Sequence, residues 1–511
     1  MKKFPLLLCL LLILSGIFSI IGFAANDSIQ ILKIGLYYPT EKVDGSNQSV
    51  LISNNQGFEL GELVDDAYVK HFNLPGFTSF KFMVDQGYHA IIGPLDSYDQ
   101  AKIVQEQIGQ EAFLVKGQAY YVYSRALGSL EEAQALEVDF KAYGQTTAAV
   151  QADNQLILIQ GDRTYGGFLA DEGDFIVCPL NSGLLGAHSL VDDHNYRGGF
   201  GVKNQYLKGI SLINYVTMQE YLYGVVPREM SRTWPIEALK AQAVVARNFA
   251  VANQNKFMDY GFNLDNTILS QVYAGFDWEG DLSNQAVDDT AGLLLYHGDI
   301  LVSGYYHSNS GGYTENSENV WSAELPYIKG VYDPFSTEDN FELVYTPDMI
   351  EKRLSEKGYS LGQLEDFYIS DYTDNNRVLN ARFVGSSGQV DLPKETIRKV
   401  FGYNEVRSTL LIVTPDNAMR LTDGMTFEDK APKQMTVLGA DGKLTTVTTD
   451  LVVTDGSTTK VFDYASTSYK VNGSGWGHGL GMSQWGAKTM AEQGFTFDKI
   501  LTFYYQGTHL E

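Results

Sequence analysis

The segment Tyr221-Leu-Tyr-Gly-Val-Val-Pro-Arg-Glu-Met230, followed by Trp234-Pro-Ile-Glu-Ala-Leu-Lys-Ala-Gln-Ala-Val-Val-Ala-Arg247, decides the fold of the central part of the chain. It predicts a strand, a turn and a helix, with a proline in the first helical turn. Small and apolar residues recur every three or four positions, which indicates a buried helix face: Ile236, Leu239, Ala243, Ala246 and Ala250. Gln242 and Arg247 fall near the two edges of this face, and both are candidates for substrate contact.

Glu229 stands between Arg228 and Met230, in the turn expected just before this helix. A carboxyl group in such a turn can be held by the fold and still meet a ligand. On local sequence alone the simpler interpretation is helix-terminus electrostatics, with Arg228 as a surface partner. Glu229 therefore becomes a functional candidate only in combination with other parts of the chain.

Two later blocks are dense in small and polar residues. They are Tyr306-His-Ser-Asn-Ser-Gly-Gly-Tyr-Thr-Glu-Asn-Ser-Glu-Asn-Val-Trp321 and Gly473-Ser-Gly-Trp-Gly-His-Gly-Leu-Gly-Met-Ser-Gln-Trp-Gly-Ala487, and the chain closes with Tyr504-Tyr-Gln-Gly-Thr508. Paired glycines allow a close approach of backbone to a ligand, and the second block can also be interpreted as a well-capped turn. The candidates for substrate binding in these blocks are His307, Ser308, Ser310, Gly311, Glu315, His478, Gln484 and Trp485.

The glycine-rich third block does not predict nucleotide binding. No Lys-Ser/Thr pair follows it, and no G-x-G-x-x-G spacing fits a strand, loop and helix with an acidic partner. Instead we expect a helix that Ser483 caps and Gly494 ends. The tryptophans of this block are more often core residues than sugar platforms, and His478 either orients Glu229 or satisfies its own loop.

Together, the three blocks resemble the SpoIID/LytB family. The resemblance implies an α+β, multi-domain chain whose mixed α/β catalytic domain spans residues 151–511, with core blocks at 206–335 and 460–509. It also implies a lytic transglycosylase that cuts between N-acetylmuramic acid and N-acetylglucosamine, in which Glu229 is the acid/base. The alternative within the family is a LytB-like amidase enhancer, which binds cell-wall glycan and stimulates a cell-wall amidase without doing chemistry.

Such chemistry needs one carboxyl whose pKa is raised by an apolar setting. No water is consumed, so the paired carboxylates of glycoside hydrolases are not required. Some family members are similar in carrying zinc on His and Cys ligands near the second block. This chain departs from them, because no Cys stands within a hundred residues of His307 and the eight His show no paired ligand spacing. We therefore expect neither a metal nor another cofactor.

The amino-terminal part predicts smaller units. Residues 26–75 form a β-rich leader, and residues 76–150 alternate strand and helix with a weak repeat, Gly93-Pro-Leu-Asp-Ser-Tyr-Asp-Gln-Ala101 and Arg125-Ala-Leu-Gly-Ser-Leu-Glu-Glu-Ala133. In each unit we expect the Ser to cap the helix that follows. The pattern fits a ferredoxin-like βαββαβ module and resembles the SPOR domain, which implies binding to glycan strands stripped of stem peptides. An α+β spacer is the alternative.

The first 25 residues predict export. Lys2 and Lys3 precede an apolar run from Pro5 to Phe23, so residues 1–25 are either a cleaved signal peptide or, because about 19 apolar residues can cross a bilayer, an uncleaved anchor. Cleavage would leave Cys178 as the one thiol and exclude an intramolecular disulfide. The net charge is −25, or −27 after loss of the two lysines (−25 − 2), which disfavours nucleic acid and anionic membrane as partners. We expect a secreted, cell-wall-associated protein with peptidoglycan glycan strands as its partner.

Overall fold

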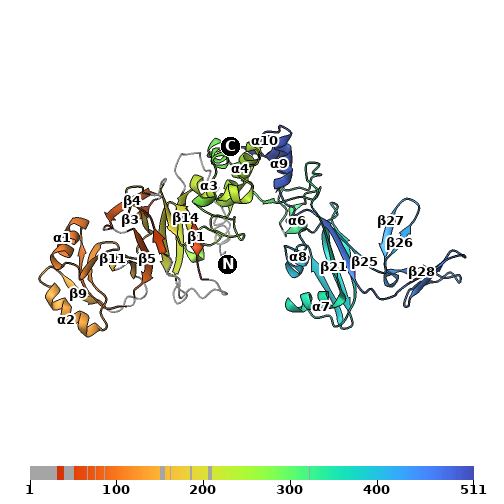
Figure 1. Ribbon diagram of the computed structural model, residues 1–511, viewed down its shortest axis with the longest axis horizontal. Helices are drawn as coiled ribbons and strands as arrows, with labels where there is room; N and C mark the ends of the chain where they lie inside the picture. Colours follow the sequence, from red (N-terminus) through yellow and green to blue (C-terminus); the bar gives the residue numbers. More distant parts are fainter. Residues whose placement is uncertain are drawn as a thin grey trace, which may run out of the picture.

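The computed structural model describes residues 31–39, 51–149, 156–183, 187–204 and 210–511, apart from residues 66, 75, 77, 86, 162 and 322. The predicted export segment, residues 1–25, lies outside this part of the chain. Within it, no helix combines the length and the apolar character needed to cross a membrane. Helices and several separate sheets are mixed along an elongated molecule (Figure 1), which confirms the α+β class.

A seven-stranded sheet supports the centre of the molecule, and its strand order is β17-β1-β16-β15-β12-β3-β4. β1 lies between β16 and β17, which come more than 170 residues later in the chain. The segment expected as a separate β-rich leader is therefore part of the sheet beneath the central helices. The bounds are β1 (Ile31–Tyr37), β3 (Phe58–Val64), β4 (Ala67–Asn73), β12 (Phe175–Pro179), β15 (Gly199–Asn204), β16 (Ile210–Thr217) and β17 (Leu264–Asp265).

A ten-stranded sheet extends to the other side, in the order β14-β13-β2-β5-β10-β11-β7-β8-β6-β9. It joins strands from the predicted leader, from the predicted module of residues 76–150 and from the start of the predicted domain of residues 151–511, so the sheet does not break at residues 75 or 150. The strands outside the repeat are β2 (Leu51–Ser53), β5 (Ser79–Val84), β10 (Leu156–Gln160), β11 (Thr164–Leu169), β13 (His188–Val191) and β14 (His194–Arg197).

The predicted repeat forms one end of this sheet (Figure 1), where the order β7-β8-β6-β9 with antiparallel neighbours is the ferredoxin-like arrangement of a βαββαβ unit. Its elements are β6 (His89–Leu95), α1 (Tyr98–Ile108), β7 (Ala112–Lys116), β8 (Tyr120–Ser124), α2 (Leu130–Phe140) and β9 (Thr146–Ala149). Ser97 caps α1 and Ser129 caps α2, each through its side-chain oxygen, which confirms the two predicted caps. The resemblance to a SPOR domain stays a prediction.

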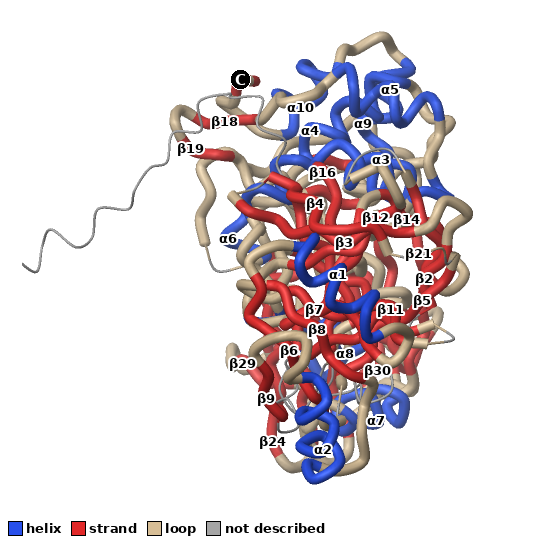
Figure 2. The backbone as a smooth tube through the Cα atoms, turned by 90° about the vertical axis from the view of Figure 1, so that its left-hand side faces the viewer, coloured by secondary structure: helices blue, strands red, loops and turns tan. Residues whose placement is uncertain are grey.

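The central helices gather along one side of the molecule, above the sheets (Figure 2): α3 (Met218–Glu229), α4 (Ile236–Ala252), α5 (Asp281–Asp289), α9 (Gln484–Glu492) and α10 (Phe497–Tyr504). α4 contacts the other four and is buried on nearly all sides, not only along the predicted stripe. Pro235 lies directly before α4 and makes no capping hydrogen bond, whereas Ser483 caps α9 as predicted. These five helices connect residues from the first and third blocks.

The expected strand and turn at residues 221–230 are wrong, because this segment is helical to Glu229. Aromatic and β-branched residues, with Gly224 and Pro227, give it a low intrinsic helix propensity. The helix forms nonetheless because its apolar side chains are buried against the core and because Thr217 and Glu220 form a capping box at its start. The spacing Thr217-x-x-Glu220 was the sequence signal for this helix.

Residues 340–474 form a second body with a hydrophobic core of its own. One sheet has the order β21-β32-β25 and another β22-β23-β24, covered by α7 and α8. Three hairpins follow, which pair β26 with β27, β28 with β29 and β30 with β31. The bounds are β21 (Asn340–Tyr345), α7 (Pro347–Glu356), β22 (Leu364–Tyr372), β23 (Val378–Gly385), β24 (Gly388–Pro393), α8 (Thr396–Phe401), β25 (Leu411–Pro415), β26 (Met419–Thr422), β27 (Phe427–Lys430), β28 (Thr436–Leu438), β29 (Leu444–Thr446), β30 (Leu451–Thr454), β31 (Thr459–Phe462) and β32 (Tyr469–Ser474).

Short elements connect these bodies. Two of them bring the second and third blocks together, because β20 and β33 pair in parallel. The bounds are β18 (Leu295–His297), β19 (Ile300–Leu301), β20 (Tyr306–His307), α6 (Ser317–Val320), β33 (Met482–Ser483) and β34 (His509–Leu510).

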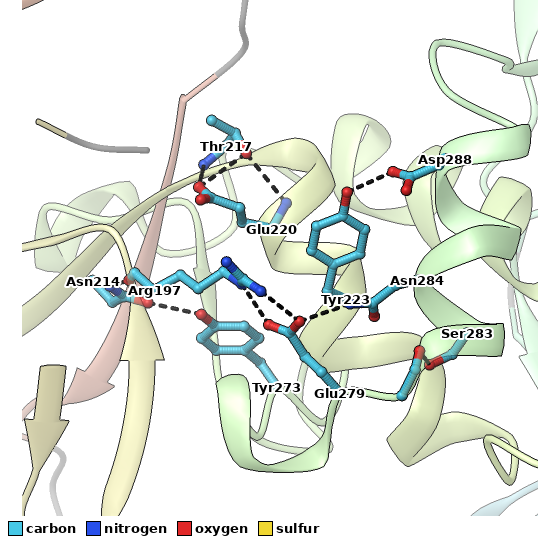
Figure 3. A network of polar contacts seen from close by, with 11 residues as sticks. Arg197, Asn214, Thr217, Glu220, Tyr223, Tyr273, Glu279, Ser283, Asn284 and Asp288 are labelled. Carbon is cyan, nitrogen blue, oxygen red and sulfur yellow. Dashed lines mark hydrogen bonds and ion pairs between the residues drawn. The ribbon is translucent and has the colours of Figure 1, made fainter. Parts of the chain in front are cut away.

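A polar network fixes α3 between the sheet and α5 (Figure 3). Arg197 makes a two-point ion pair with Glu279, at 2.6 and 2.8 Å, and Asn284 donates to the same carboxylate at 2.8 Å. The Tyr223 hydroxyl donates to Asp288 at 2.5 Å, and the hydrogen bond to Glu279 raises the pKa of Arg197. The network holds the helix that ends at Glu229.

We expect Glu279→Ala to lower the free energy of unfolding by about 2 kcal/mol, because it leaves the half-buried Arg197 guanidinium without its carboxylate. Glu279→Gln, which keeps one acceptor oxygen, should cost less. The measurement is the midpoint of urea unfolding. Equal stabilities of Glu279→Ala and wild type would show that the ion pair contributes nothing.

Candidate active site at Glu229

The three blocks meet in the folded chain. Tyr306 of β20 lies opposite Met482 of β33, and the Trp485 backbone N–H donates to the Ser308 carbonyl at 3.0 Å. The third block reaches the first through Gln484, whose Nε2 donates to Gln242 Oε1 at 3.3 Å across 242 positions of sequence. The fold therefore brings together three segments that are far apart in the sequence.

Glu229 is the last residue of α3 and is partly exposed. Its Oε1 accepts a hydrogen bond from the backbone N–H of Val272 at 3.1 Å. The Tyr306 hydroxyl and the Gln484 side chain also hydrogen-bond to this carboxylate. The carboxyl is thus fixed by groups from three separate segments while one side remains open to solvent.

The pKa of Glu229 is raised above its ordinary value, and burial is the largest cause. Hydrogen bonds from Val272, Tyr306 and Gln484, together with the charge of Arg228, act in the opposite direction. The position of Glu229 at the carboxyl end of α3 adds to the rise, because the negative end of a helix dipole disfavours a second negative charge. A carboxyl in this state can donate a proton and then take one back.

Two of the predicted residues support Glu229 directly or through one neighbour. Gln484 contacts the carboxylate, and Gln242, fully buried on α4, holds the Gln484 amide. The Nε2 of Gln242 has no hydrogen-bond partner in the described part of the chain. Gln242 therefore supports Gln484. Its full burial argues against the predicted contact with substrate.

Trp485 follows Gln484 and is 37% exposed. Its ring packs against Trp234 with centroids 4.9 Å apart, and Lys488 lies near both rings. Trp476, expected in the core, is 40% exposed. The core interpretation of both tryptophans is therefore wrong, and Trp234 with Trp485 forms an aromatic pair next to Gln484.

Arg247 and Glu315 have structural positions. Arg247 is 3% exposed and donates to the Leu293 carbonyl at 3.1 Å, and burial lowers its pKa to about 10. Glu315 is fully buried and accepts from Thr373 at 2.6 Å and Asn319 at 2.9 Å. Neither side chain is open to a ligand, so we reassign both from substrate binding to scaffolding.

The small residues of the second block build the junction with the third. Ser310 is fully buried; its backbone N–H donates to Ser483 Oγ at 3.2 Å, and its hydroxyl donates to Asp333 at 2.7 Å. Gly311 has φ of 72° and packs so closely on Ser474 that a Cβ would lie 2.8 Å from its backbone. Ser308 is partly exposed and is the member of this group that stays available to a ligand.

His307 and His478 fasten β20 to the loop before β33. His307 Nδ1 donates to the Leu480 carbonyl at 3.1 Å, and the Leu480 N–H donates to His478 Nδ1 at 3.0 Å. His478 also hydrogen-bonds to the Tyr306 backbone. No contact links His478 to the Glu229 side chain, so it acts on the site by holding the strand that carries Tyr306.

Three site residues escaped the sequence analysis: Tyr306 as a partner of Glu229, Val272 as a backbone donor, and Gln271, which donates to the Tyr306 hydroxyl at 3.1 Å. Tyr306 begins the second block, but the small and polar pattern of this block predicted its neighbours as site residues instead. Gln271 and Val272 lie in a loop with no periodicity or glycine signal. Only the fold reveals their role.

The rest of the described chain offers no obvious alternative centre. No group of three or more His, Cys, Asp or Glu in the described ranges is arranged to hold a metal ion. A cavity of about 1170 Å³ lies between the hairpins and β32, lined by residues such as Asp416, Arg420 and Lys470. It contains none of the residues around Glu229, and the polar groups of the three blocks make the Glu229 site the stronger candidate.

The fold and the site define an α+β domain in which three distant segments surround one carboxyl group. Residues 206–297 match the family model described as stage II sporulation protein (SpoIID). The chain is 32% identical over 297 residues to the amidase enhancer of Bacillus subtilis, covering 57% of this chain and 40% of that protein. It is 29% identical over 319 residues to stage II sporulation protein D of Bacillus subtilis, covering 58% and 75%. The family model and these two relatives support a relationship of the chain to the SpoIID/LytB family.

We expect stability to fall at acidic pH because the pKa of His478 is lowered to about 3 and that of His307 is also well below its ordinary value, both chiefly through burial. The unfolded chain binds protons at these residues below about pH 6.5, whereas the native state does not. Their contribution is complete above pH 6.5 and is lost as the pH falls toward 3. Urea unfolding between pH 7.5 and 4 measures it.

The control is the double variant His307→Gln/His478→Gln, which has no imidazole that titrates at these positions. Its stability should decline less over the same pH range. Parallel pH profiles of variant and wild type would contradict the expectation.

Proposed function

We propose that this protein is secreted, associates with the cell wall and cleaves peptidoglycan glycan strands as a lytic transglycosylase. The observation that carries the proposal is Glu229, a partly exposed carboxyl with a raised pKa at the meeting point of the three family blocks. The match of residues 206–297 to the SpoIID family model and the similarity to stage II sporulation protein D support it. The bond cut is the one between N-acetylmuramic acid and N-acetylglucosamine.

In the proposed reaction, protonated Glu229 gives its proton to the glycosidic oxygen, and the bond from that oxygen to C1 of the muramyl residue breaks. The C6 hydroxyl of the same residue then attacks C1, and its proton goes to the Glu229 carboxylate. A 1,6-anhydro end forms, no water is consumed, and the acid is regenerated. One carboxyl serves both steps because burial raises the pKa of Glu229, which favours the protonated acid at the start and makes the carboxylate a stronger base afterwards.

Exposed aromatic side chains near the site suit a sugar substrate. All five tryptophans of the sequence lie in the core blocks, and each is at least partly exposed: Trp234, Trp278, Trp321, Trp476 and Trp485. Indole rings stack on the C–H faces of sugars while their polar edges meet hydroxyl groups. Trp485 follows Gln484 and pairs with Trp234, and the centroid of the Trp278 ring lies 4.1 Å from the guanidinium carbon of Arg228, so both surfaces are candidates for stacking beside Glu229.

The second candidate is a non-catalytic amidase enhancer, favoured by the 32% identity to a protein of that name. In this function the same site binds glycan and presents it, or the protein itself, to a cell-wall amidase. Retention of a partly exposed, hydrogen-bonded Glu229 would then serve binding. The two functions are distinguished by the 1,6-anhydro product, because only the transglycosylase cleaves glycan strands by itself.

We expect Glu229→Gln to reduce formation of anhydro-muramyl products by about 10²- to 10⁴-fold, the usual contribution of a general acid/base. Purified protein is incubated with glycan strands, and mass spectrometry detects products lighter by one water than hydrolysis products. Glu324→Gln, a change at a surface carboxyl paired with Lys329, is the matched control and should keep full activity.

Undiminished activity of Glu229→Gln would refute the catalytic assignment. If the wild type forms no anhydro product yet raises the rate of a cell-wall amidase, the enhancer function replaces the enzyme.

We further propose that the βαββαβ unit of residues 89–149 is a SPOR-like module that directs the protein to denuded glycan. Its topology and the serine caps on both helices support the resemblance. We expect the Glu229→Gln protein, which does not degrade its ligand, to be retained more strongly by peptidoglycan stripped of stem peptides with an amidase than by untreated peptidoglycan. Co-sedimentation measures the retained fraction, and equal retention would contradict the proposal.

A further inference from the structure

A continuous chain of hydrogen bonds leads from the core of the protein to Glu229. The Tyr221 hydroxyl donates to Gln271 Oε1 at 3.2 Å, and Gln271 Nε2 donates to the Tyr306 hydroxyl at 3.1 Å. The Tyr306 hydroxyl in turn hydrogen-bonds to the Glu229 carboxylate. Tyr221 and Glu229 belong to the same helix, so the chain leaves α3, crosses the loop at Gln271 and returns to the end of α3.

Gln271 gives this chain a direction. Its carbonyl oxygen only accepts and its amide nitrogen only donates. With Oε1 occupied by the Tyr221 hydrogen, the amide N–H faces Tyr306 and fills a lone pair of that hydroxyl. The hydrogen of Tyr306 is then left for Glu229. The reverse orientation would turn the Tyr306 hydrogen toward Gln271 and leave two oxygens facing each other when Glu229 is ionised.

The same loop supplies a second donor to Glu229. Val272, the residue after Gln271, donates its backbone N–H to Glu229 Oε1 at 3.1 Å. Gln271 is 1% exposed and Tyr221 is fully buried, so these two members of the relay are shielded from bulk water, whereas Tyr306 and Glu229 are partly exposed. The loop therefore controls both a backbone and a side-chain hydrogen bond to the carboxylate.

We propose that Gln271 and Tyr306 are positioning residues that aim the Tyr306 hydrogen at Glu229 and stabilise the carboxylate formed when Glu229 has donated its proton. This inference rests on the proposed transglycosylase function. Hydrogen bonds to an ionised carboxylate are about twice as strong as those to its neutral form, so the relay acts mainly after proton transfer. It lowers the energy of the ionised intermediate and fixes the oxygen that takes the proton back from the C6 hydroxyl.

The test compares three variants in which the ionisation of Glu229 is followed directly. Tyr306→Phe removes the donor. Gln271→Glu keeps the length of the side chain but accepts the Tyr306 hydrogen and so reverses the relay. Tyr305→Phe is the matched control, since this neighbouring tyrosine packs against Trp321 and has no contact with Glu229. Infrared difference spectra against Glu229→Gln report the carboxyl as a function of pH, independently of activity.

We expect the pKa of Glu229 to rise by roughly one unit in Tyr306→Phe, the size of one charge-assisted hydrogen bond, and by at least as much in Gln271→Glu. The pH at which transglycosylase activity falls on the alkaline side should rise by the same amount, with turnover on the plateau reduced about tenfold. Tyr305→Phe should match the wild type in both measurements. Thermal melting establishes that each variant is folded, and if Gln271→Glu does not fold, Tyr306→Phe alone decides.

An unchanged Glu229 pKa in folded Tyr306→Phe would overturn the relay, whatever the activity. Loss of turnover without a shift of the pH profile would also overturn it, because that result indicates a purely structural role. A protein without transglycosylase activity would refute the proposed function, yet the infrared titration would still decide whether the relay reaches Glu229.

Discussion

The burial of helix α4 is the constraint on which the rest of the central domain depends. An α-helix enclosed on nearly all sides cannot leave its polar side chains to water, so each must find a partner in the surrounding segments. The Asn248 amide donates hydrogen bonds to the carbonyls of Leu295 and Val302, at 2.8 and 2.9 Å, and the Gln242 side chain accepts a hydrogen bond from Gln484. The buried polar residues of one helix therefore fix the chain segments that surround it, and one of these segments carries the amide that contacts Glu229.

The amino-terminal strand takes part in the same arrangement. β1 lies between β16, which leads into α3, and β17, which begins the loop that carries Gln271 and Val272. Backbone and side-chain bonds between Lys33 and Asn263, both at 2.8 Å, hold that loop against the strand. The donors to Glu229 thus depend on residues near the start of the chain, which explains why the expected leader is built into the domain.

Sequence reasoning located Glu229, Gln484 and Trp485 because the three blocks resemble a known family, not because local patterns identified a site. It failed where tertiary packing overrides propensity, as in the helix that ends at Glu229. The spacing of residues on a helix also does not show how deeply the helix is buried. Arg247 lies at the edge of the predicted apolar face, yet its side chain is inside the core. The role of Gln271 could not be predicted from the sequence, because only the fold places this loop residue between two tyrosines.

The second body is attached to the site by two buried charged residues, which explains why the second and third blocks need their glycines. Arg377 is 1% exposed and donates to the carbonyls of Ser310 at 2.8 Å and Tyr313 at 3.0 Å, while Glu315 accepts from the turn that precedes Arg377. Gly479 lies against the guanidinium with φ of 82°, and a Cβ there would come within 2.5 Å of Arg377. A side chain at this position would push Arg377 away from both carbonyls. The loop that carries His478 and leads to Gln484 therefore keeps its glycine because the second body is fastened through it.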